Sequence, residues 1–365
     1  MAFCTLFDSN YADKGLVLYK SLKATMQDFE LYILAMDELV NNILTTLNYD
    51  KIKVIKLEDF VSFMGLGDAK KNRTRAEFCW TCTPFLIDYV IRKYNEPICT
   101  YIDADMYFFK DPTDLINEMH DKNVQIVEHR FTNSLYDKYA KKTAGTYCVE
   151  FNTFKNEQKS MDLLKWWEDR CKESCSQNGV EGVMGDQYYL NDWGDKENVS
   201  VLQNLGGGVA PWNVGQYKLV SSNAAISFKK RRENTIYDLV FYHFHNLSYI
   251  DKNKVNISVY QRRLFVDKQL VNKIYFRYLE ELKSAKEYLE DNFGFYPLII
   301  KHPGFANNVK KDHNILKKIG QSLKENGLIK TIEVAMLIVR DKIVCVINGK
   351  KNILTITEKV DKWTI

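Results

Sequence analysis

Two aspartates one residue apart follow an apolar run in the first third of the chain. Asp103 and Asp105 flank Ala104 within Tyr101-Ile-Asp-Ala-Asp-Met-Tyr. Two carboxylates this close repel each other unless a positive charge offsets the repulsion, and their oxygens suit Mg²⁺ or Mn²⁺ shared with a diphosphate. A solvated turn is the alternative, because Asp-x-Asp is common. The position after a hydrophobic strand favours the metal site.

Two histidines extend this candidate metal site. His243 and His245 alternate in the apolar run Phe241-Tyr-His-Phe-His-Asn, so in a strand they would share one face. A lone core histidine is usually structural, but here two carboxylates are already available. Manganese accepts an imidazole nitrogen more readily than magnesium does, which favours Mn²⁺. We predict Asp103, Asp105 and His243 as the ligands, and the sequence does not decide between His243 and His245.

The N-terminal loop offers groups that could bind a nucleotide base. Asp8, Asn10 and Tyr11 follow a strand-like run that ends at Phe7. A base can stack on the tyrosine while the carboxylate and amide read its hydrogen-bonding edge. A helix N-cap built from Asp or Asn explains the same residues.

Strands and amphipathic helices alternate through the first half of the chain. Their spacing predicts a doubly wound, mainly parallel α/β sheet of the Rossmann-like kind, in which ligands lie beyond the carboxyl ends of the strands. Asp8 and the two aspartates would both lie at that edge. The expected strands are residues 3–7, 29–35, 52–57 and 98–102, and the expected helices include 16–26, 39–47 and 85–93.

Composition and charge divide the chain into two regions. We expect a nucleotide-sugar-binding domain over residues 1–250 and a smaller, basic, helix-rich region over 251–365. The second region carries 22 Lys and Arg against 13 Asp and Glu. It is expected to contain helices at 275–292 and 310–326 and strands at 334–339 and 343–347. No signal peptide or membrane-spanning run is evident, so a cytoplasmic address is expected.

The order of the motifs resembles the family 8 glycosyltransferases, over roughly two thirds of the chain. Members of this family have the GT-A fold and are retaining enzymes that mostly use UDP-sugars. The matching positions are Asp8, Asn10, Tyr11, Ser21 and Leu22; Asp103 and Asp105; Thr143-Ala144-Gly145; Gly185-Asp186-Gln187; and His243-Phe244-His245-Asn246. Thr143 stands where the family has Asn, Asn246 stands where it has Gly, and the lysine usual shortly after that Gly is absent.

The resemblance implies a role for each matching position. Asp186 and Gln187 would lie beside the reacting sugar carbon, and Glu128 is a second carboxylate candidate there. The implied donor contacts are Phe7, Asp8, Asn10, Tyr11, Ala104, Asp105, Thr143, Ala144, Gly145 and His245.

Two more residues are candidate donor contacts on chemical grounds. Gly207, inside Gly206-Gly-Gly208, could let backbone amides approach a diphosphate, although a tight turn before Pro211 explains the glycines equally well. Arg75 could bind phosphate, although a solvated charged loop is common for such a residue.

These features predict a metal-dependent glycosyltransferase that moves a sugar from a UDP-sugar to a glycan or lipid-linked acceptor. The alternatives are a nucleotidyltransferase acting on sugar phosphates and a non-catalytic sugar-nucleotide-binding protein. No nucleic-acid-binding motif is evident. The basic C-terminal region suits either peripheral contact with the inner face of an anionic plasma membrane or a solvated basic surface. The aromatics that would suit a lipid interface are Tyr275, Phe276, Tyr278, Phe293, Phe295 and Tyr296.

Overall fold

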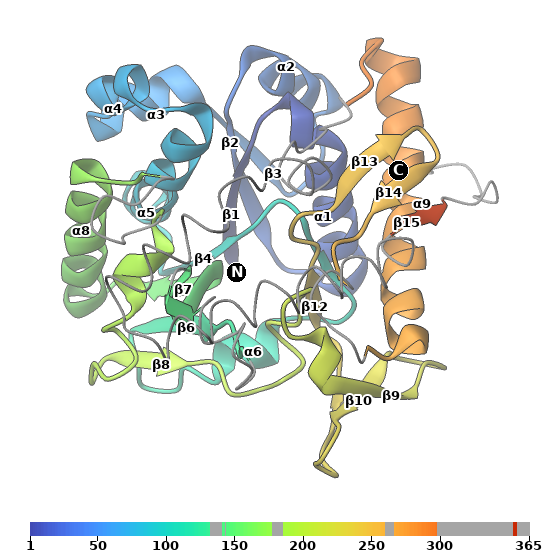
Figure 1. Ribbon diagram of the computed structural model, residues 1–365. Helices are drawn as coiled ribbons and strands as arrows, with labels where there is room; N and C mark the ends of the chain where they lie inside the picture. The colour runs from blue at the N-terminus through green and yellow to red at the C-terminus, as the bar shows by residue number, and fades with distance from the viewer. Residues whose placement is uncertain (132–140, 143, 177–184, 260–265, 298–352, 356–365) are drawn as a thin grey trace, which may run out of the picture.

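The computed structural model describes residues 1–131, 141–142, 144–176, 185–259, 266–297 and 353–355. Its centre is a seven-stranded sheet in the order β3-β2-β1-β4-β7-β6-β8 (Figure 1). The first four strands in the chain are parallel: β1 (Ala2–Phe7), β2 (Glu30–Ala35), β3 (Ile52–Lys56) and β4 (Ile98–Ile102). The predicted α/β class and all four predicted strands are confirmed, within one residue at each end.

One strand runs against the others. β7 (Tyr147–Lys155) lies between β4 and β6 (Val124–Glu128) and is antiparallel to both, whereas β8 (Val199–Val201) is parallel to β6. The sheet is therefore mixed. Because β7 lies beside β4, its residues reach the edge where the two aspartates lie.

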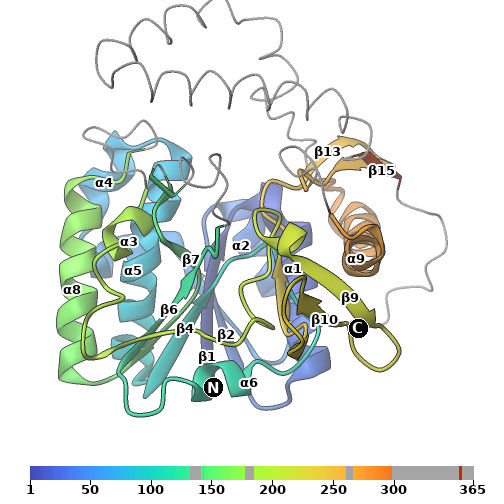
Figure 2. The same ribbon diagram turned by 60° about the horizontal axis from the view of Figure 1, so that its bottom comes forward.

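Helices cover both faces of the sheet (Figure 2). Alternate residues of β1 divide between two cores: Cys4 packs on the side of α5 and α8, and Phe3 packs on the side of α1. This alternation is what a sheet buried on both faces requires. The helices are α1 (Ala12–Thr25) and α2 (Glu38–Leu47) on one side, and α3 (Leu57–Met64), α4 (Gly67–Asn72), α5 (Arg75–Tyr94) and α8 (Gln158–Glu173) on the other.

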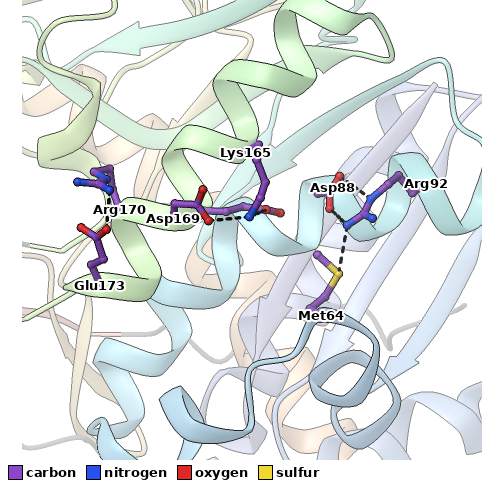
Figure 3. A network of polar contacts seen from close by, with 8 residues as sticks. Met64, Asp88, Arg92, Lys165, Asp169, Arg170 and Glu173 are labelled. Atoms are coloured by element: carbon purple, nitrogen blue, oxygen red, sulfur yellow. Dashed lines mark hydrogen bonds and ion pairs between the residues drawn. The ribbon is translucent and has the colours of Figure 1, made fainter.

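Helix α5 begins ten residues earlier than the predicted 85–93 segment. Thr74 and Glu77 form a reciprocal capping box that starts the helix, and Pro84 is accommodated in its interior. The predicted segment begins directly after Pro84, whereas the helix continues through this proline from its start at Arg75. Ion pairs lie on the surfaces of α5 and α8, among them Asp88 with Arg92 and Lys165 with Asp169 (Figure 3).

A small two-stranded sheet extends the carboxyl end of β4. β5 (Met106–Phe108) pairs antiparallel with β12 (Phe241–His243), which is far away in the chain. Other short elements in this half are α6 (Thr113–Asn117), β9 (Tyr217–Ser221), β10 (Ser227–Lys230), β11 (Ile236–Asp238) and the 3-10 helices η1 (Ser9–Tyr11), η3 (Gln187–Leu190) and η4 (Val214–Gln216).

The described part of the C-terminal region packs directly on the N-terminal region. Helix α9 (Lys268–Phe293) begins at the side-chain cap of Asp267 and lies against α1, where Lys20 pairs with Glu281 at 2.5 Å. A three-stranded sheet of β13 (Ser248–Asp251), β14 (Lys254–Asn256) and β15 (Ile353–Thr355) lies beside it. The boundary at residue 250 stays a prediction, and the segments expected at 310–326, 334–339 and 343–347 lie outside the described residues.

Two aromatics expected at a lipid surface are in the core instead. Tyr275 and Tyr278 are fully buried on the inner face of α9, because they pack against Phe244. Phe276, between them, is 44% exposed. None of the described helices is long and apolar enough to span a bilayer.

Candidate functional site

Asp103, Asp105 and His243 converge at the carboxyl end of β4. The turn after β4 is closed by a hydrogen bond from Met106 N to Asp103 O, and the register of β5 with β12 places His243 opposite Met106. Nε2 of His243 lies 3.0 Å from Oδ1 of Asp105 and 3.5 Å from Oδ2 of Asp103. One ligand atom from each of the three residues lies within 4.8 Å of the others. The predicted ligand set is thus a compact cluster in space.

A residue that the sequence analysis did not select completes the cluster. Glu150, on β7, is fully buried, and its Oε2 lies 2.7 Å from Nδ1 of His243. The neighbouring strands bring it there, because Asp103 N donates to Glu150 O. A carboxylate that accepts a hydrogen bond from Nδ1 leaves the lone pair of Nε2 available to a metal ion. Metal-binding histidines usually have such a carboxylate partner. The available signal was an acidic residue between the apolar residues Val149 and Phe151.

The charged groups of the cluster shift one another's pKa values. Burial raises the pKa of Asp103 to about 7, against the opposing effect of His243. Burial also opposes ionisation of Asp105, but His243 and Lys14 outweigh it and hold the pKa of Asp105 well below its usual range. Burial lowers the pKa of His243, yet Asp105 outweighs this effect and the pKa is well above its usual value.

This arrangement fits a divalent cation. Nε2 of His243 faces the two aspartates, so an ion at this position would meet two carboxylates and one imidazole nitrogen. Two carboxylates and one imidazole are hard-to-intermediate ligands that suit Mn²⁺, and Mg²⁺ less well. The structure thus supports a possible acidic and histidine metal site, and the identity of the metal stays a prediction.

The predicted nucleotide loop lies at the end of β1, next to β4 in the sheet. Asp8 Oδ1 accepts from the backbone N of Asn10 at 2.9 Å, which caps η1, and Asp8 Oδ2 lies 2.6 Å from Nε of Arg75. The same arginine pairs with Asp37, at the end of β2. Asp8 therefore caps η1, as the alternative interpretation predicted, and also forms an ion pair. Through this ion pair Arg75, a predicted donor contact, touches Asp8, which is another predicted donor contact.

Tyr11 lies next to the metal cluster. Its ring is partly buried, and Nζ of Lys14 lies 3.7 Å from the ring centroid. Lys14 lowers the pKa of Tyr11, but burial and the charge of Asp105 outweigh this effect and raise the pKa above its usual value. By contrast, the side chain of Phe7 points into the core, where a Cβ on Gly15 would lie 2.3 Å from its ring. Ala104 is buried between the two aspartates.

The motifs that contain Ala144 and Gln187, both matched by resemblance, contact each other. Gln187 Nε2 donates to the carbonyl of Ala144 at 2.7 Å, and Gly145 has a φ of 88°, which favours glycine. Asp186 is buried, and burial raises its pKa to about 7. Its charge contributes to the raised pKa of Asp103, so it lies near the metal cluster. Thr143 lies outside the described residues.

Glu128 and Gly207 lie in other surroundings. Glu128 ends β6 opposite Tyr147 of β7, whereas Glu150 is the carboxylate that touches the cluster. At Gly207 a side chain would clash with Leu115 and Leu202, so close packing explains the glycine. Its carbonyl accepts from Arg130. Their proposed roles toward a donor stay predictions.

The two histidines differ in environment. β12 ends at His243, which is buried, whereas His245 is exposed. The ring of Trp212, which the sequence analysis did not select, lies 5.4 Å from each of them. Asn246 has a φ of 60°, in the left-handed region that suits glycine first and asparagine next. This explains how Asn replaces the Gly of the resemblance.

Comparison with known proteins finds two similar curated sequences, and no family model matches. The chain is 27% identical to the uncharacterized protein YfnF of Bacillus subtilis (strain 168) over 260 residues, covering 70% of this chain and 84% of YfnF. It is 24% identical to YfnD of the same strain over 304 residues, covering 81% and 94%.

Solved structures also align with the chain. One is the galactosyltransferase LgtC in complex with donor and acceptor sugar analogues, at 15% identity and a TM-score of 0.46, covering 67% of this chain and 87% of that one. Another is mouse xyloside xylosyltransferase 1, at 12% identity and a TM-score of 0.42, covering 67% and 98%.

Proposed function

We propose that this protein is a metal-dependent glycosyltransferase of the GT-A fold that transfers a sugar from a UDP-sugar with retention of configuration. The observation that carries the proposal is the cluster of Asp103, Asp105 and His243 at the carboxyl end of β4, beside the Asp8 and Tyr11 loop. In a doubly wound sheet this edge is where a nucleotide ligand binds.

The residues divide the work as follows. Tyr11 and Asp8 would hold the base, and Asp103, Asp105 and His243 would hold Mn²⁺, with Glu150 orienting the imidazole. The bound ion would supply positive charge to the diphosphate leaving group, so that no general acid is needed. Asp186 and Gln187 lie beside the donor sugar, and the acceptor hydroxyl attacks from the face that the diphosphate leaves.

The acceptor is a glycan or a lipid-linked sugar in this proposal. Trp212 supports a sugar ligand because a partly exposed indole offers an apolar face for a pyranose ring. Its ring also lies beside the predicted metal ligand His243.

Turnover with a panel of nucleotide sugars tests the proposal. We expect UDP release from at least one UDP-sugar with Mn²⁺, with a suitable glycan acceptor present, and none in EDTA. Pyrophosphate release from UTP and a sugar 1-phosphate would favour the nucleotidyltransferase instead. Metal-dependent UDP binding without turnover of any donor would favour the non-catalytic protein.

A further inference from the structure

Two lysines are buried on the neighbouring helices α1 and α9, near the metal cluster. Lys14, on α1, is 3% exposed, and Lys286, on α9, is 1% exposed. Each ammonium lies over a tyrosine ring: Lys14 over Tyr11 and Lys286 over Tyr249. Buried lysines are rare because removing an ammonium from water is costly, so two in one place call for an explanation.

One aspartate lies between them. Asp13 is fully buried, interacts electrostatically with both lysines, and accepts a hydrogen bond from the Tyr249 hydroxyl. Its other oxygen, Oδ1, has no hydrogen-bond partner among the described residues. One carboxylate is thus shared by two buried lysines, and burial lowers the pKa of one of them, Lys286, to about 8.

Lys14 is the lysine that faces the candidate donor site. It lies over the Tyr11 ring and interacts electrostatically with Asp105, two residues of that site. Lys286 instead lies over Tyr249, which is outside that site. In the described part of the chain no carboxylate forms an ion pair with Lys14. A charge left without such a partner in a poorly solvated place exerts a long-range field on whatever binds nearby.

We propose that Lys14 is an electrostatic positioning residue for the anionic donor: its buried charge, next to the Tyr11 ring, attracts the diphosphate. Asp13 lies near both this charge and Lys286 of α9. This inference rests on the proposed function. It makes a distinctive prediction about signs, because a positive charge attracts a diphosphate but repels the divalent cation that the same site binds.

Calorimetry on the full chain tests the sign. In Lys14→Met and Lys14→Gln, UDP affinity at saturating Mn²⁺ should fall on the order of 10-fold, the effect of one poorly screened charge nearby. Mn²⁺ affinity without nucleotide should be unchanged or higher. Thermal stability should not fall, because a costly buried charge has been removed. Lys286→Met is the matched control, and its UDP affinity should change much less.

Several outcomes would overturn the proposal. Unchanged UDP affinity in both Lys14 variants would do so, as would equal losses in Lys14→Met and Lys286→Met. Weaker binding of both Mn²⁺ and UDP, or failure of both neutral variants to fold, would make Lys14 a structural residue. If the unaltered protein binds no UDP with Mn²⁺, the proposed function fails first, and that result is separate from any effect of Lys14.

Discussion

Oε2 of Glu150 lies 2.7 Å from Nδ1 of His243, and both side chains are buried. The other ring nitrogen, Nε2, faces Asp103 and Asp105 at 3.5 and 3.0 Å. One carboxylate thus fixes the orientation of the imidazole while two others share the site with it. The pairing links β7 with β12 across the end of β4, so the metal site depends on the antiparallel insertion of β7.

Glu150→Gln tests the role of this pairing. The amide keeps the size of the side chain but removes the charge behind the imidazole, so we expect Mn²⁺ affinity to fall about 10- to 100-fold. Calorimetric titration with Mn²⁺ measures it. Glu173→Gln on the exposed surface of α8 is the control and should bind as the unaltered protein does. Equal affinity in the two variants would contradict the assignment.

Substitution of each histidine separates their roles. His243→Ala should weaken Mn²⁺ binding strongly, because His243 is buried with Nε2 toward both aspartates. His245→Ala should weaken it much less, since His245 is exposed and lies outside the proposed ligand set. Electron paramagnetic resonance of Mn²⁺ gives the free and bound fractions. A larger loss in His245→Ala would show that the wrong histidine was assigned.

Tyr11→Ala and Asp8→Ala should raise the KM for the UDP-sugar more than they lower kcat. Contacts with the base are equal in the ground and transition states, so their loss weakens binding rather than the chemical step. Loss of a stacking contact is worth roughly 1 to 3 kcal/mol, or about 5- to 150-fold in affinity. Steady-state kinetics with the active donor measure both constants. An unchanged KM would leave Asp8 as the cap of η1 only and would remove Tyr11 from the base site.

The stability of the protein should depend on pH through Glu168. Burial, reinforced by Asp88, raises the pKa of this carboxyl from 4.5 to about 8. Between these values the folded state binds more protons than the unfolded state, so the free energy of unfolding falls as pH rises. Glu168→Gln removes this penalty. We expect a Tm gain of about 2 °C or more near pH 8.5 and little gain near pH 5, measured by calorimetry. An equal shift at both pH values would refute it.

Much of the fold follows from local pattern. The strands ending at Phe7, Ala35 and Ile102 are apolar runs bounded by polar loops, and parallel strands place such ends at one edge. Asp103 and Asp105 were therefore predictable, because they follow a strand directly. A histidine ligand from the run that contains His243 and His245 was predictable from its chemistry, but the sequence did not decide between the two.

The remaining features of the site depend on long-range pairings of strands and helices that no local sequence pattern indicates. Glu150 reaches the site only because β7 inserts antiparallel beside β4, and Lys14 reads in sequence as an ordinary helical lysine. Its burial needs α9, which comes from more than two hundred residues later in the chain. The outward orientation expected for Tyr275 and Tyr278 was wrong for the same reason: α9 turns that face to Phe244.

Calorimetric titration of the unaltered protein with UDP, in Mn²⁺ and then in EDTA, tests the central claim most directly. The account predicts saturable binding at one site in Mn²⁺, loss of that binding in EDTA, and the same loss in folded Asp103→Ala and Asp105→Ala variants. UDP affinity that is the same in Mn²⁺ and EDTA, or that survives both substitutions, would contradict a metal-dependent nucleotide-sugar site at the end of β4.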